Sequence, residues 1–172
     1  MTRLVVVGMG YVGIPSAALF ADVPDFSVVG VQRRTRRSGW KIDCLNMGGC
    51  PIGGEEPGLT ELIKRVVRRG SLRVTDDASA FGEADAILIG VQTPVDESHV
   101  PRYESLREAT REVGQRMMPG ALVCIESTVA PGTIQHLVKP LLEEASGMRA
   151  GVEFNLVYSY ERVMVGDSYT TW

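Results

Sequence analysis

The stretch RLVVVGMGYVG at residues 3–13 joins a run of apolar, mostly β-branched residues to a glycine-rich turn. Residues 14–20 follow with a helical pattern rich in alanine and leucine. A strand, a G-x-G-x-x-G turn and a helix in this order are typical of a dinucleotide-binding site. We therefore expect the cofactor to contact Gly8, Met9, Gly10, Tyr11, Val12 and Gly13.

Each of the three glycines has a distinct expected role in this turn. Gly8 allows the tight turn out of the strand, and Gly10 lets a pyrophosphate lie against the backbone. Gly13 lets the helix pack close to the strand. The N-terminus of that helix then offers free N–H groups and a partial positive charge to the phosphates.

Length and composition restrict the classes of protein that remain. The 172 residues predict a dinucleotide-binding domain at 1–165 and a frayed tail at 166–172. A net charge of −3 gives no electrostatic case for nucleic acid, and no apolar run is long enough to span a membrane. The three cysteines, Cys44, Cys50 and Cys124, are too few and scattered for a disulfide framework or a zinc site. We expect no metal and a cytoplasmic location.

Apolar runs alternate with helical patterns along the whole chain. Strands are expected at 26–32, 72–75, 84–91, 121–125 and 154–158, and helices at 38–46, 59–69, 76–81, 103–118 and from Pro131 to about Ser146, kinked at Pro140. The unbroken apolar run at 84–91 is typical of a parallel sheet covered on both faces. The pattern predicts an α/β fold with a doubly wound, mostly parallel, Rossmann-like sheet in three layers.

The end of the second expected strand bears on the choice of cofactor. An acidic residue normally reads the ribose hydroxyls at this place, but the chain has Gln32, followed by Arg33. An amide can still bond a hydroxyl, which is compatible with NAD. A missing carboxylate beside arginines is also what the 2′-phosphate of NADP would require. The residues leave both cofactors open, with Gln32 and Arg33 as candidate contacts.

Further candidates follow the later strands, because ligands of such sheets lie at the carboxyl ends of the strands. Thr93 and Pro94 follow the fourth strand and are candidates for the cofactor wall. Thr128 follows the fifth strand and can offer a hydroxyl to the same cleft. Glu161 and Arg162 leave the sixth strand on the cleft side of the sheet.

Five strings in order and spacing carry a family resemblance: GMGYVG at 8–13, GEEPGL at 54–59, IGVQTPVDE at 89–97, ESTVAPGT at 126–133 and YSYERVMVG at 158–166. Together they resemble the N-terminal NAD-binding domain of the UDP-glucose / UDP-N-acetyl-D-mannosamine dehydrogenase family. The ERV string favours the N-acetyl-mannosamine branch. Such enzymes oxidise C6 of a nucleotide sugar to a carboxylate, using two NAD and a cysteine-bound intermediate.

The resemblance implies roles for several residues of this chain. Tyr11, Val12, the Gln32 position, Thr93 and Thr128 would line the NAD site. Glu161 would face the reacting centre, where a carboxylate can handle protons or position water, and Thr128 would join it as a catalytic residue. Arg162 and Val163 would approach the UDP-sugar.

The chain also departs from the pattern of that family. Gln32 replaces the usual acidic residue, and Tyr160 replaces the usual proline before Glu161. The resemblance implies that family members continue with a central region, followed by a domain that supplies the nucleophilic cysteine and most UDP contacts. These parts are not in this sequence, so we expect dinucleotide binding without turnover. The full-length protein is expected to be a homo-oligomer. A hydroxy-acid dehydrogenase domain and a stand-alone dinucleotide-binding regulatory module are the alternatives.

Overall fold

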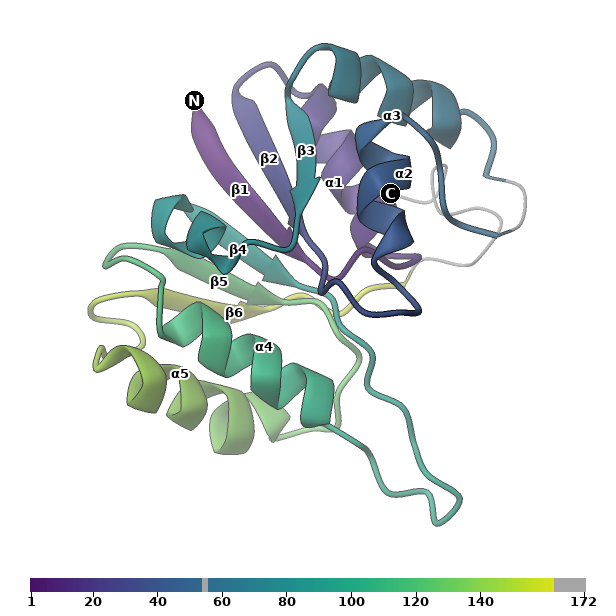
Figure 1. Ribbon diagram of the computed structural model, residues 1–172. Helices are drawn as coiled ribbons and strands as arrows, with labels where there is room; N and C mark the ends of the chain where they lie inside the picture. The colour runs from purple at the N-terminus through teal and green to yellow at the C-terminus, as the bar shows by residue number, and fades with distance from the viewer. Residues whose placement is uncertain (54–55, 163–172) are drawn as a thin grey trace.

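The computed structural model describes residues 1–53 and 56–162, and its six strands form one sheet. The strands lie in the order β3-β2-β1-β4-β5-β6, and every neighbouring pair is parallel. Figure 1 shows the sheet running through the middle of the molecule. The strands are β1 (Thr2–Val7), β2 (Phe26–Val31), β3 (Leu72–Thr75), β4 (Ala86–Ile89), β5 (Leu122–Ile125) and β6 (Asn155–Tyr158).

The strand order places a topological switch point between β1 and β4. From β1 the chain first adds β2 and β3 on one side and then returns to add β4, β5 and β6 on the other. Val7, the last residue of β1, lies beside Val31 of β2 and Ile89 of β4. In doubly wound sheets the ligand lies at the carboxyl ends of the strands, at this point.

One face of the sheet is covered by the helices of the first half of the chain. These are α1 (Gly13–Asp22), α2 (Trp40–Asn46) and α3 (Leu59–Arg68), and Figure 1 shows them together on one side of the sheet. In α3 the apolar residues at helical spacing, Leu59, Leu62, Ile63 and Val66, are all buried. They join Leu4 and Val6 of β1 in one hydrophobic core.

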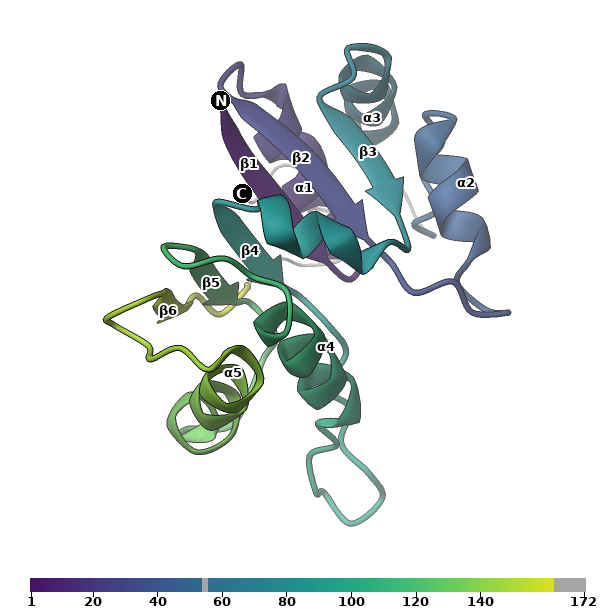
Figure 2. The same cartoon turned by 60° about the vertical axis from the view of Figure 1, so that its left-hand side comes forward.

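The opposite face carries the helices that follow β3 in the chain. They are η1 (Ala78–Glu83), α4 (Glu104–Gly114), η2 (Ile134–Val138) and α5 (Lys139–Ser146), as Figure 2 shows from the side. Their buried residues pack on Val5 and Val7, the alternate side chains of β1. The predicted three-layer, doubly wound parallel fold is therefore confirmed.

Two expected helices differ in detail from the structure. The helix expected at 76–81 is the 3₁₀ helix η1, and the Asp77 carboxylate caps it by accepting from the Ser79 N–H at 2.8 Å. The helix expected to bend at Pro140 has a π-helical turn, η2, directly before α5. Proline has no N–H and its ring clashes with the carbonyl four residues earlier, so a widened turn at this place is physically reasonable.

The remaining differences are shorter elements. The strand expected at 84–91 is limited to Ala86–Ile89, and the helix expected at 103–118 ends at Gly114. The expected tail at 166–172 lies outside the described residues. Over the described part of the chain, none of the helices has the length and apolar character needed to cross a membrane.

Candidate functional site

The glycine-rich turn brings the end of β1 against β4 and α1. Gly8 has a φ of +97°, and a Cβ there would lie 2.5 Å from the Gly90 carbonyl oxygen. A Cβ on Gly13 would lie only 2.0 Å from the Gly8 carbonyl oxygen. Both positions require glycine, because no real Cβ approaches backbone so closely. The tight turn and the close helix packing that we predicted are both present.

Gly10 differs from its two neighbours. A Cβ on Gly10 would meet no protein atom within 4 Å, so the space beside this backbone is open. Within the protein alone nothing requires glycine here, whereas a ligand lying against the backbone would. The turn therefore fits a pyrophosphate.

The N-terminus of α1 points at the same open space. Val12 precedes the helix without capping it by its side chain, and the first turn contains no acidic residue. The Ile14 N–H donates to the Gly10 carbonyl at 3.1 Å, so the helix begins directly out of the glycine turn. Uncapped N–H groups and the positive end of the helix dipole favour an anion at this place.

Gln32 fastens the glycine turn to the end of β2. Its Oε1 accepts from the Met9 N–H at 3.0 Å, and its Nε2 donates to the Arg33 carbonyl at 3.3 Å. The Lys41 ammonium donates to the Met9 carbonyl at 3.1 Å from the start of α2. The Met9 side chain is buried in the core, so Met9 offers the cleft its backbone.

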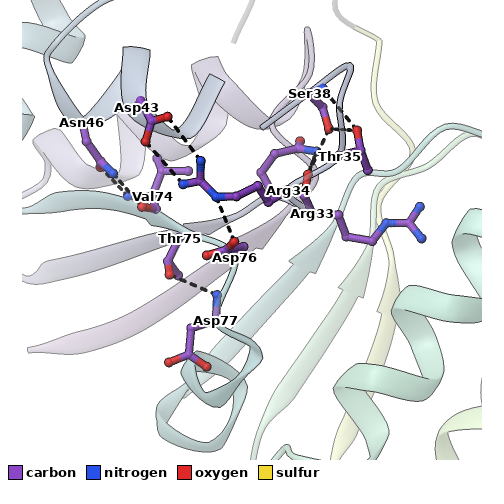
Figure 3. A network of polar contacts seen from close by, with 11 residues as sticks. Arg33, Arg34, Thr35, Ser38, Asp43, Asn46, Val74, Thr75, Asp76 and Asp77 are labelled. Carbon is purple, nitrogen blue, oxygen red and sulfur yellow. Dashed lines mark hydrogen bonds and ion pairs between the residues drawn. The ribbon is translucent and has the colours of Figure 1, made fainter. Parts of the chain in front are cut away.

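Two of the four arginines that follow β2, Arg33 and Arg34, are paired with acidic side chains. Arg34 bonds Asp43 at 3.2 Å and Asp76 at 3.0 Å, whereas the Arg33 side chain points away from that network in Figure 3. Arg33 forms an ion pair with Glu108 of α4 instead. Exposed pairs of this kind contribute little stability, but they neutralise the guanidinium charge.

A cleft of about 820 Å³ opens between the glycine turn, the end of β2 and α4. Its walls include Gly8, Gly10, Gln32 and Arg33, which the sequence had suggested as cofactor contacts. This volume is within the usual range for small-molecule sites. The other suggested contacts, Tyr11, Val12, Gly13, Thr93, Pro94 and Thr128, are not part of its walls.

The turns after β4 and β5 are locked together by hydrogen bonds. The Ser127 hydroxyl accepts from the Val91 N–H at 2.9 Å and donates to the Val91 carbonyl at 2.8 Å. The Thr93 hydroxyl donates to the Thr128 carbonyl at 2.7 Å. Sequence reasoning missed Ser127, because its partner lies 36 residues away. This lock positions Thr93 and Thr128 at the carboxyl end of the sheet.

Glu126 is a second residue that sequence reasoning missed. It follows β5 directly, is 9% exposed, and its Oε2 has no hydrogen-bond partner. Burial, and secondly the charge of Glu161, raise the pKa of this carboxyl from 4.5 to about 7. Its place as the first residue of the ESTVAPGT string was the available signal.

The end of β6 carries the last group of candidates. Glu161 is half-buried there, and the Arg162 guanidinium lies 4.8 Å over the Tyr160 ring and donates to its hydroxyl. Tyr160, which stands where the resemblance expects proline, thus holds Arg162. Val163 lies outside the described residues.

Neither Cys124 nor Cys44 offers an activated thiol. Burial raises the pKa of the Cys124 thiol to about 11, with a further increase from Glu126. Burial also raises the pKa of Cys44 above its ordinary value. A raised pKa disfavours the reactive thiolate. Within residues 1–53 and 56–162, no group of three or more His, Cys, Asp or Glu side chains is arranged to bind a metal ion.

Comparisons with known proteins agree with this geometry. A family model described as UDP-glucose/GDP-mannose dehydrogenase family, NAD binding domain, matches residues 2–170. A UDP-N-acetyl-D-mannosamine dehydrogenase of Pyrococcus horikoshii is 38% identical over 95% of this chain, which covers 37% of that protein. A GDP-mannose 6-dehydrogenase of Pseudomonas savastanoi pv. phaseolicola is 36% identical over 92% of this chain and 36% of its own length.

A solved structure shows the same arrangement. The NDP-N-acetyl-D-galactosaminuronic acid dehydrogenase of Methanosarcina mazei Go1 superimposes with a TM-score of 0.95 and 46% identity. The match covers 99% of this chain and 36% of that one, so this chain spans little more than a third of its relatives. The cofactor of the family's domain is NAD, which decides between the two cofactors left open. The chain belongs to the UDP-glucose/GDP-mannose dehydrogenase family and is its NAD binding domain.

Proposed function

We propose that this chain is the cofactor half of a nucleotide-sugar 6-dehydrogenase, with UDP-N-acetyl-D-mannosamine or UDP-glucose as substrate. The open backbone at Gly10, at the uncapped start of α1, is the observation that carries the cofactor part of this proposal. The names of the relatives support a nucleotide sugar. Family membership disfavours the alternative of a hydroxy-acid dehydrogenase domain.

The described residues divide the work of binding the cofactor. The N–H groups after Gly10 hold the pyrophosphate. Gln32 bonds the adenosine ribose through the hydrogen-bonding capacity of its amide that the Met9 N–H does not use. Glu108 neutralises Arg33, which makes this guanidinium a poor partner for a 2′-phosphate. The cofactor, when bound, supplies the electron acceptor for oxidation at C6.

The residues after β5 and β6 face the reacting end in this proposal. Thr128 is fixed by Thr93 and by the Ser127 lock, so its hydroxyl is available at a defined place. Glu161 takes up or positions the proton that leaves the sugar hydroxyl. Arg162 approaches the nucleotide sugar, together with Val163.

This chain spans about 37% of a relative's length, and the family resemblance implies that the nucleophile and most UDP contacts lie in the remaining part. We therefore propose that the 172 residues bind NAD without steady turnover, and that the full-length protein is a cytoplasmic homo-oligomer. The contrasting possibility is a stand-alone dinucleotide-binding module.

Calorimetric titration of the 172-residue chain with NAD and with NADP, at one fixed salt concentration, tests the cofactor assignment. We expect NAD to bind more tightly. The Gly10→Val variant should lose this binding, because its side chain fills the space of the pyrophosphate. Tighter binding of NADP, or equal binding by Gly10→Val, would contradict the assignment.

A further inference from the structure

One oxygen of the buried Glu126 carboxyl has no hydrogen-bond partner among the described residues. This oxygen is Oε2, and the side chain is nine-tenths buried. Leaving a buried polar atom unsatisfied is costly, and such groups in native proteins usually have a role. The cofactor contacts described above make no use of it.

Glu126 lies where the turns after three neighbouring strands meet. Its N–H donates to the Ile89 carbonyl of β4 at 3.0 Å, and the Ser159 N–H after β6 donates to the Ile125 carbonyl at 3.0 Å. The Oε2 atom would be 3.7 Å from a Cβ placed on Gly90, and Val12 is 4.0 Å from that same point. The carboxyl is therefore beside the switch point, directly under the Gly90 backbone.

This position is on the β4–β6 side of the switch point, where the nicotinamide end of a bound cofactor would lie. The pyrophosphate is assigned to the start of α1, and the adenosine ribose to Gln32 at the end of β2. The two halves of a doubly wound sheet each take one mononucleotide. The second mononucleotide, which carries the nicotinamide ring, would then lie over the ends of β4, β5 and β6.

Glu161 acts on Glu126 across the ends of two paired strands. The negative charge of Glu161 opposes ionisation of Glu126. Burial favours the protonated form of Glu126, and the nearby charge of Glu161 adds to this effect.

Apart from Glu161, the described surroundings of Glu126 include one titratable group, the Cys124 thiol. Cys124, two residues earlier in β5, is neutral because its pKa is raised to about 11. The turn at residues 90–92 carries no charge, and α1 carries none before Asp22. Glu161 is therefore the charged side chain that governs this carboxyl among those described.

We propose that Glu126 is the proton-holding partner of Glu161 beneath the nicotinamide ring, and that the pair exchanges one proton as the ring gains or loses its positive charge. Glu126 is a positioning residue in this scheme, because it acts through Glu161. The inference rests on the function proposed above.

The exchange balances the oxidation of an alcohol. As a C–H bond of the sugar breaks, its electron pair and hydrogen pass to the ring, which loses its positive charge. The O–H proton passes to the carboxyl pair, and a carbonyl forms. The pair gains one positive charge while the ring loses one, so their summed charge does not change. No other oxidant or acid is required.

The test compares the affinity of the chain for NAD and NADH between pH 5.5 and 8.5. Only the oxidised ring is positive, so NAD should favour the ionised pair and NADH should not. We expect the NAD-to-NADH affinity ratio to rise roughly fivefold or more with pH, as is usual for coupled sites. Titrations common to both cofactors cancel in this ratio.

Two variants provide the comparison. Glu126→Gln should make the ratio independent of pH, within about twofold. Glu83→Gln changes the same charge on the exposed side chain at the end of η1 and should keep the full pH response. A pH-independent ratio in the unaltered chain, or a full response in Glu126→Gln, would overturn the inference.

Carboxyl-carbon NMR can measure the titration of Glu126 in the chain without cofactor. This measurement tests the inference independently of whether the chain binds NAD. The Glu126 signal should titrate near pH 7. The midpoint should fall in the Glu161→Gln variant, because this substitution removes the negative charge that raises the pKa of Glu126. Glu161 is less buried than Glu126, so this variant disturbs the core less. A Glu126 midpoint below pH 5.5 would overturn the inference. Failure to bind NAD, with the midpoint near 7, would instead contradict the proposed function.

Discussion

Single residues at the glycine turn divide into those that the fold needs and those that a ligand needs. A Cβ on Gly8 or Gly13 would clash with a backbone carbonyl, whereas a Cβ on Gly10 would point into open space. The G-x-G-x-x-G string predicted these separate roles. The distances around each missing Cβ agree with the structural roles of Gly8 and Gly13, and they make all three roles testable one by one.

The variants Gly13→Ala and Gly10→Ala should therefore fail in different ways. A Cβ on Gly13 meets the Gly8 carbonyl at 2.0 Å, so Gly13→Ala should lose about 3 kcal/mol or more of unfolding free energy. Gly10→Ala should keep the thermal midpoint but bind NAD at least about tenfold more weakly. Thermal unfolding and calorimetry measure the two effects. Similar midpoints for both variants would contradict this assignment.

Burial of Glu126 also makes a prediction for the dependence of stability on pH. Because the pKa is raised from 4.5 to about 7 on folding, the folded state binds the proton more tightly. The contribution is fully present below pH 4.5 and is lost as the pH rises through about 7, by about 3 kcal/mol. Urea unfolding at several pH values should show this loss in the native chain and a flatter profile in Glu126→Gln. Equal slopes would count against the burial of this carboxyl.

At the scale of elements, the site depends on connections between the ends of strands. Ser127 joins the turn after β5 to the turn after β4, and the Arg33–Glu108 pair joins the end of β2 to α4. The first connection is buried and uncharged, and the second is exposed and ionic. We expect the first to determine stability and the second to determine cofactor choice.

Ser127→Ala should lower the unfolding free energy by about 1–3 kcal/mol, because it leaves the Val91 N–H and carbonyl without their partner. Amide hydrogen exchange at Val91 should accelerate. Ser146→Ala is the matched control, because it removes a serine hydroxyl from the distant helix α5. Unchanged protection of the Val91 amide from exchange in Ser127→Ala would show that the Ser127 hydrogen bonds do not stabilise the turn after β4.

Glu108→Gln should release Arg33 from its ion pair and make the guanidinium available to a 2′-phosphate. We expect affinity for NADP to increase about fivefold relative to NAD. Glu112→Gln, one helical turn further along α4 on the same cleft wall, is the control with the same change in charge. An equal gain in both variants would attribute the effect to net charge and not to Arg33.

At the scale of the whole molecule, the chain corresponds to the NAD binding domain of its family and covers about 37% of the length of a relative. The two hydrophobic cores, one on each face of the sheet, give it the composition of an independent domain. Those of its active-site candidates that the structure describes lie at the carboxyl end of that sheet. Binding can thus be separated from turnover experimentally.

Saturating NAD should stabilise the isolated chain while producing no turnover. At a free concentration of about 100 times the Kd, the unfolding free energy should rise by about 2.7 kcal/mol. Incubation with NAD and UDP-N-acetyl-D-mannosamine should produce no steady absorbance of NADH. The same substrate with a full-length relative is the positive control, and steady turnover by this chain would contradict our proposal.

The sequence by itself determined the fold class, the cofactor turn and the family. These follow from local patterns: apolar runs of strand length, glycines at defined spacing, and strings at the ends of strands. Because the carboxyl ends of parallel strands meet at one edge, Thr93, Thr128 and Glu161 could be assigned to that edge without coordinates. Their contacts with cofactor and substrate stay predictions.

Only the tertiary structure decided how those strand ends support one another. The burial of Glu126, the lock between Ser127 and Val91, and the Arg33–Glu108 pair all join residues from separate elements. Their geometry depends on which strands are neighbours and how closely the turns pack. A sequence pattern reports neighbours along the chain, whereas burial and hydrogen bonding are set by neighbours in space.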